Sequence, residues 1–180
     1  MRFSIAAAAA WAAQIPSLAG IAPDGRPAVK LCVEIGTPDP WVTRRGEFIA
    51  QEIYSQIGIR LDWSHRTQCR EGDGILIHVG SAPSPAVHPS ALAYAWLARA
   101  RIEVFYDRIA ASAAPLAAPD LMGHVLAHEI AHVLQGVVRH SEEGIMKAHW
   151  TQLDYERMRP HPMQFAPEDV ALIRAGMLGR

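Results

Sequence analysis

Two histidines and a glutamate stand close together in the stretch HEIAH, in a pattern that could bind a metal ion and transfer a proton. His128 and His132 are four positions apart, and Glu129 directly follows the first histidine. On a helix, residues four apart lie one turn apart on one face, so both imidazoles can reach the same cation. Zinc binds imidazole nitrogen in tetrahedral geometry, and catalytic zinc sites keep one position for water. Glu129 could then act as general base for attack of that water on a peptide carbonyl.

The helix that carries these residues is strongly apolar, which indicates that it is buried. Its apolar positions are Leu121, Val125, Leu126, Ile130, Val133 and Leu134. Histidines and a glutamate in a buried helix are costly unless each has a partner in the core or a metal ion binds them. His124 extends the same stripe, but eight residues separate it from His132, which is about 12 Å along a helix axis. We therefore interpret His124 as a packing or hydrogen-bonded neighbour of the site.

A third ligand would have to come from the chain that follows the helix. Gly136 is a typical helix end and lets the chain turn back. His140 comes four residues later, on a loop that can fold under the site. Met146 follows, and its thioether would form an apolar floor rather than a ligand.

The segment from His128 to Met146 resembles the zinc-binding segment of metzincin metallopeptidases, and of matrixins in particular. Their motif HExxHxxGxxH is followed in matrixins by a serine and then by a methionine-containing turn. The resemblance implies three zinc ligands, namely His128, His132 and His140. It also implies that Glu129 is the general base and Met146 the Met-turn residue. The chain is similar, too, to short exported bacterial proteins with an HEIGH…HSxxGIM pattern.

The match departs from the metzincin pattern at three points. The second and third histidines are eight residues apart instead of six, and Gln135 stands where the family has glycine. Some metzincins use a tyrosine just after the Met-turn to assist the oxyanion, but here Lys147 and Ala148 follow Met146, so that tyrosine has no match in the motif. Tyr155 is the residue that could take its place in space. In a gluzincin-type arrangement the third ligand would instead be Glu156, from a later helix. The His-Ser…Gly-Ile-Met continuation has no role there, which favours His140.

The surrounding sequence predicts a sheet with two main helices. Alternating or β-rich runs predict strands at 28–35, 59–64, 75–80, 91–97 and 101–109. Helical spacing predicts the main helices at 41–58 and 119–135, and a last helix from Pro167. We predict the α/β (α+β) class, with a metzincin-like mixed twisted sheet, two main helices and a short C-terminal helical tail. The resemblance implies that 91–97 is the edge strand along which metzincins pair a substrate.

The first 19 residues are typical of a secretory signal peptide. Arg2 precedes an apolar stretch, and Ser17-Leu18-Ala19 provides a small-x-small cleavage site. Removal of 1–19 would leave 20–180 as a single secreted or periplasmic domain, whereas an Ala-rich helix or tether is the alternative. Two cysteines in an exported chain favour a disulfide between Cys32 and Cys69 over free thiols.

The amino-acid composition indicates little about the function, but it argues against some functional classes. The net charge is −1 and 19% of the 180 residues are charged, so the chain has no overall positive charge that would attract nucleic acid. We predict a secreted zinc endopeptidase that uses a zinc-bound water and Glu129. We expect a monomer with a peptide or protein substrate, no nucleic acid and no stable membrane insertion. The alternatives are a secreted zinc-binding module of the same fold without proteolytic activity, a gluzincin-type peptidase with Glu156 as ligand, and a metal-free structural domain.

Overall fold

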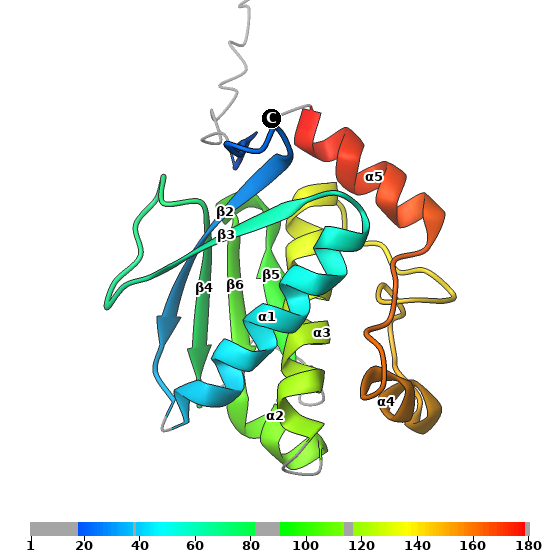
Figure 1. The fold of residues 1–180 in the computed structure, drawn as a ribbon. Helices are drawn as coiled ribbons and strands as arrows, with labels where there is room; N and C mark the ends of the chain where they lie inside the picture. The colour runs from blue at the N-terminus through cyan, green and yellow to red at the C-terminus, as the bar shows by residue number, and fades with distance from the viewer. Residues whose placement is uncertain (1–17, 38, 82–90, 114–116, 179–180) are drawn as a thin grey trace, which may run out of the picture.

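The computed structural model describes residues 18–37, 39–81, 91–113 and 117–178. These residues form a layer of strands with helices packed against it (Figure 1). The strands are β1 Ala19–Ile21, β2 Pro27–Ile35, β3 Arg60–His65, β4 Ile75–Gly80, β5 Ala93–Trp96 and β6 Arg101–Phe105. The helices are α1 Pro40–Gln56, the 3-10 turn η1 Leu97–Arg99, α2 Tyr106–Ser112, α3 Ala118–Gln135, α4 Gln152–Met158 and α5 Pro167–Leu178.

The sheet is mixed, as the sequence predicts. Its order is β1-β2-β4-β6-β5, and β3 pairs with β2. The pairs β2–β3, β2–β4 and β4–β6 are parallel, whereas β1–β2 and β5–β6 are antiparallel. Among the described strands, the antiparallel β5 therefore forms one edge of the sheet, in the segment where the resemblance implies an edge strand.

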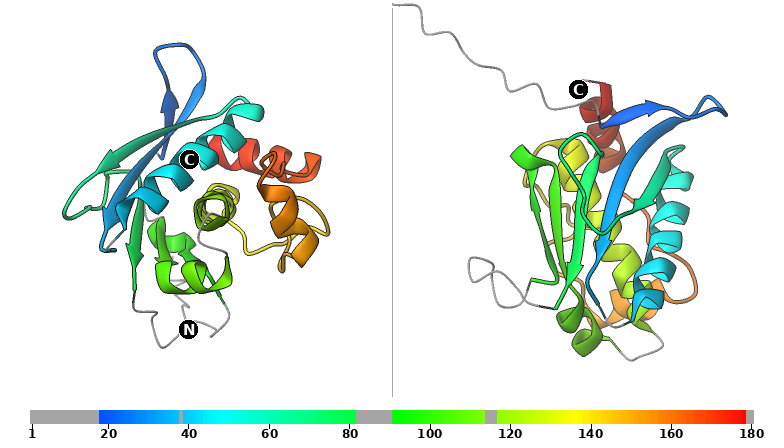
Figure 2. Two further views of the ribbon diagram at one scale, coloured as in Figure 1. Left: turned by 60° about the horizontal axis from the view of Figure 1, so that its bottom comes forward. Right: turned by 90° about the vertical axis from the view of Figure 1, so that its left-hand side faces the viewer.

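Helix α3 runs through the middle of the molecule. Figure 2 (left) looks nearly down its axis and shows α1, α2, α4 and α5 around it. Its contact with α1 is close because Gly123 faces that helix: a Cβ there would lie 2.6 Å from the Cβ of Ile49. Almost all of α3 is buried, with Glu129 the notable partly exposed residue near its middle. The burial that the apolar pattern predicts for this helix is confirmed.

The predicted strand 101–109 is wrong in its second half. Strand β6 ends at Phe105, where its last pair with Gly80 closes the ladder to β4. Beyond Gly80 there is no further partner from β4, and Tyr106–Ser112 forms the short helix α2 with Ile109 buried. The alternation of polar and apolar residues in this segment does not reveal that change.

The predicted signal peptide lies mostly outside the described residues. Leu18 and Ala19 are within them: the Leu18 side chain is buried, and Ala19 pairs with Val29 in β1. Strand β1 was not expected from the sequence. Cleavage after Ala19 stays a prediction, as does the single domain 20–180, and such cleavage would remove Leu18 from the core.

A disulfide joins Cys32 on β2 to Cys69 in the loop before β4. Cys32 alternates along the strand with Leu31 and Val33, whose side chains belong to the core under the helices. The disulfide therefore lies on the face of the sheet that points away from α1 and α3. None of the described helices is long and apolar enough to cross a membrane.

Candidate metal centre

Helix α3 positions His128 and His132. Pro119 lies in its first turn and Asp120 complements the positive end of the helix dipole. The helix ends at Gly136, whose φ of 71° is the left-handed conformation that glycine adopts readily. Both histidines are buried and their rings lie 4.7 Å apart, on one face of the helix as the four-residue spacing requires.

The structure brings His140 to the same place from the loop after α3. Its ring centroid lies 5.3 Å from that of His128 and 5.0 Å from that of His132. One ring nitrogen from each of the three histidines lies within 4.8 Å of the others. The His140 side chain is exposed, so the group opens to solvent on one side.

The orientation of the two helical histidines leaves two lone pairs facing each other. Nδ1 of His128 lies 2.8 Å from the carbonyl oxygen of Ile145, and Nδ1 of His132 lies 3.3 Å from that of Val137. A carbonyl can only accept, so in each neutral ring Nδ1 carries the proton and Nε2 is an acceptor. The two Nε2 atoms are nevertheless only 3.0 Å apart. Tetrahedral zinc with bonds of about 2.0–2.1 Å separates its nitrogen ligands by roughly 3.3 Å, so this pair fits a metal ion well.

The protonation states of these rings also suit a metal. Burial, with a contribution from His132, lowers the pKa of His128 to about 3. Burial lowers the pKa of His132 to about 4, and His140 acts in the same direction. Both imidazoles are therefore neutral near pH 7, which is the form that binds a metal.

The loop that carries His140 is held at both of its ends. The longer connection between His132 and His140 is accommodated by an exposed turn, in which Val138 is 77% exposed. Past His140, the backbone of Ser141 bonds to the carbonyl oxygen of Met146, and Ser141 also forms an isolated β-bridge with Lys147. Ser141 and Met146 are buried. The turn that ends at Met146 thus supplies, through Ile145, the carbonyl that orients His128.

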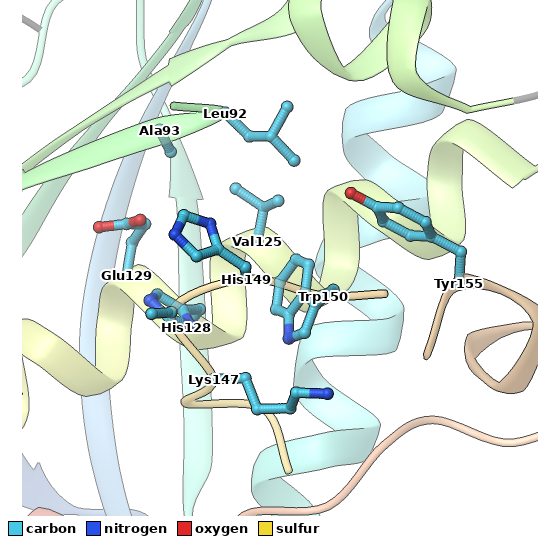
Figure 3. A pocket seen from close by; sticks show the side chains of 10 residues that line it. Leu92, Ala93, Val125, His128, Glu129, Lys147, His149, Trp150 and Tyr155 are labelled. Atoms are coloured by element: carbon cyan, nitrogen blue, oxygen red, sulfur yellow. The ribbon is translucent and has the colours of Figure 1, made fainter. Parts of the chain in front are cut away.

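Glu129 lies beside the histidines in a pocket that His128 also lines (Figure 3). Burial raises the pKa of its carboxyl group to about 8. The pocket has a wall from the β5 side at Leu92 and Ala93, and an opposite wall from the segment after Met146. A cation held by the adjacent histidines would favour the ionised form of this group, and that carboxylate can accept a proton from a molecule bound in the pocket.

The remaining candidates lie elsewhere. His124 is fully buried, with Nδ1 2.7 Å from the carbonyl oxygen of Asp120 and Nε2 accepting from the Met163 backbone at 2.9 Å. Both of its nitrogens are occupied, which confirms its interpretation as a hydrogen-bonded neighbour. Glu156 is exposed on α4, and its carboxylate bonds to Gln152 at 3.4 Å rather than joining the three histidines. The geometry therefore favours His140 over Glu156.

Two residues near the site were not singled out from the sequence. Asp169 lies in the first turn of the last helix, where acidic residues are common, and its buried carboxylate bonds to Ser141. His149 follows the Met-turn segment and lines the same pocket as Glu129. Neither position carries a local sequence signal, because each acts through residues distant along the chain.

Comparison with known proteins supports the fold. No family model and no curated protein matches the sequence. Among solved structures, the archaemetzincin from Methanopyrus kandleri is similar with a TM-score of 0.59, covering 84% of this chain and 96% of that chain. Sequence identity is 15%, so the similarity shows a shared fold and confirms the predicted mixed α/β architecture. The matrixin-like and exported-bacterial resemblances stay predictions.

Proposed function

We propose that this protein, which shares the fold of archaemetzincin, is a zinc-dependent peptidase whose ligands are His128, His132 and His140. The observation that carries the proposal is the pair of Nε2 acceptors 3.0 Å apart, with His140 completing a three-nitrogen group. The name of the fold neighbour also supports it, because metzincins are the family that the motif resembles.

Each residue of the site would have a distinct role. The three imidazoles would hold the ion, and the carbonyl oxygens of Ile145 and Val137 would keep two of them oriented. When bound, zinc supplies Lewis acidity that lowers the pKa of water and polarises a carbonyl group. Glu129 would accept a proton on its carboxylate as the water oxygen bonds to the carbonyl carbon. The same carboxyl group would pass that proton to the nitrogen as the C–N bond breaks.

The substrate would be an extended peptide that pairs with β5. This strand forms the edge of the sheet on the side of the pocket, and Ala93 contributes to both the strand and the pocket wall. An unpaired strand edge offers backbone donors and acceptors to an added strand. Binding there would carry a peptide carbonyl past Glu129.

Export of the protein is part of the proposal. The Cys32–Cys69 disulfide is of a kind that persists in oxidising compartments. Together with the signal-like N-terminus, it supports a secreted or periplasmic location. Sequencing the N-terminus of the exported protein would test it.

The test of the peptidase function is cleavage of a mixed peptide library by the zinc-loaded protein and by Glu129→Gln. We expect hydrolysis by the wild type and a loss of at least about 10³-fold in the variant, with zinc content unchanged. Glu52→Gln, which alters an exposed carboxylate on α1, is the matched control and should cleave normally. A wild type that binds zinc but cleaves nothing would instead indicate a zinc-binding module, and a Glu129→Gln protein as active as wild type would refute the mechanism.

A further inference from the structure

His149 projects into the pocket next to the metal centre. It lines this pocket together with His128 and Glu129 (Figure 3), and its imidazole lies beside the Glu129 carboxylate in that view. The side chain is exposed, and within the described residues neither of its ring nitrogens has a hydrogen-bond partner. His149 lies close enough to His140 to interact with it electrostatically, so it is near the open side of the three-histidine group. A polar ring aimed into a pocket without a protein partner is available to a ligand.

The chain on both sides of His149 is anchored near the metal centre. On one side, Lys147 forms a bridge with Ser141 and an ion pair of 2.5 Å with the buried Asp154. On the other side, the Trp150 ring packs edge-on against His128 at 5.7 Å. These contacts fix the backbone around His149 beside the metal centre, so its side chain starts from a defined point at the pocket.

Besides the polarisation of the carbonyl group that zinc would supply, the proposed reaction calls for a protein donor at the carbonyl oxygen. When water adds to a peptide carbonyl, the C=O electron pair moves onto the oxygen, which becomes negatively charged. Donors placed at such an oxygen typically account for a large part of catalysis. The sequence suggested Tyr155, which also lines the pocket, but in Figure 3 the Trp150 indole lies between Tyr155 and His128. In the same view (Figure 3), His149 lies on the side of the indole that faces Glu129.

We propose that His149 is a further catalytic residue, which donates an N–H hydrogen bond to the oxyanion formed when a peptide carbonyl is attacked. This inference rests on the proposed peptidase function. The proton of the water still goes to Glu129 and then to the departing nitrogen, so His149 transfers no proton. An imidazole carries at least one N–H in either protonation state, and the ring can therefore donate whether charged or neutral.

The experiment compares His149→Ala, His149→Gln and the control His161→Ala, which removes an exposed histidine between α4 and α5. We expect kcat of His149→Ala to fall by about 10²–10³-fold with KM nearly unchanged, as for loss of an oxyanion donor. His149→Gln keeps an N–H donor and should stay within about tenfold of wild type. His161→Ala should behave as wild type, and all three variants should retain wild-type zinc content.

A second readout does not depend on turnover. A phosphinic peptide, which presents a tetrahedral anionic group in place of the scissile amide, should bind His149→Ala more weakly by a factor similar to the loss in kcat. The product peptides should bind wild type and variant equally. Equal phosphinate affinity and equal kcat in an active wild type would overturn the role of His149 and leave the proposed function intact. Loss of zinc from His149→Ala would also overturn it, whereas an inactive wild type would refute the proposed function itself.

Discussion

The Oγ atom of Ser141 lies 2.7 and 2.8 Å from the two carboxylate oxygens of Asp169, so the residue after His140 is tied to the first turn of α5. Arg139, on the other side of His140, donates to the same carboxylate at 2.8 Å. Asp169 is fully buried. Both chain neighbours of the third histidine are therefore held by one carboxylate that lies far away in the sequence.

Asp169→Asn should weaken zinc binding although Asp169 is not among the three histidines of the centre. The amide would lose part of its bonding to Ser141 and Arg139, and His140 would become less well positioned. We expect zinc affinity to fall about 10- to 100-fold, measured by competition with a chelator. Glu143→Gln is the matched control, because it alters an exposed carboxylate in the same loop, away from Arg139, Ser141 and Asp169. Wild-type affinity in Asp169→Asn, with a normal melting temperature, would contradict this role.

Alanine variants of His140 and Glu156 distinguish the two candidates for the third zinc ligand. His140→Ala should reduce zinc affinity by at least about 10²-fold, because two imidazoles without a third ligand hold zinc weakly. Glu156→Ala should leave zinc content unchanged, since Glu156 lies apart from the three histidines. Metal analysis after dialysis against a weak chelator measures both. The reverse result would assign the third ligand to α4.

The ion pair between Lys147 and Asp154 should make stability depend on pH in the acid range. Burial opposes ionisation of Asp154, but hydrogen bonds from Lys147 and Thr151 outweigh it and lower the pKa to about 2. Because the pKa is lower in the folded state, the stabilisation is present above pH 4 and is lost as the pH falls towards 2. We expect Asp154→Asn to be about 2 kcal/mol less stable at pH 7, by denaturant unfolding.

The same measurement at low pH provides the check on Asp154. The difference between wild type and Asp154→Asn should shrink between about pH 4 and pH 2. Asp62→Asn, which breaks a more exposed pair with Arg60, should show a much smaller difference at pH 7. A constant difference across the acid range would show that Asp154 acts through packing rather than charge.

Removing the disulfide should lower stability without emptying the metal centre. Closing a loop with a sequence separation of 37 is worth about 4 kcal/mol by chain entropy. The disulfide lies on the sheet face opposite α3, so the double variant Cys32→Ser, Cys69→Ser should keep wild-type zinc affinity when folded. Denaturant unfolding and chelator competition, each at low temperature, measure the two quantities. A folded double variant that cannot hold zinc would show that the disulfide supports the site.

Local patterns were sufficient for most elements of the sheet and for the main helices. The predicted strand 75–80 coincides with β4, and the predicted helix 119–135 differs from α3 by one residue. The predicted strand 101–109 is too long because the end of β6 depends on the length of its partner β4. The alternation of residues within the segment contains no information about that partner. Strand β1 was missed for a similar reason, since three residues carry no periodic signal and form a strand only by pairing with β2.

Helical spacing is a local property of the chain, so the sequence alone predicts that His128, Glu129 and His132 share one buried helix. The sequence also makes His140 the favoured third ligand, but only by resemblance. The tertiary structure alone decided that His140 meets the other two rings, that Asp169 holds its loop and that His149 enters the pocket. These placements depend on how α5 and the segment after Met146 pack back against α3. Contacts between residues so far apart arise from the folded core, and no spacing along the chain encodes them.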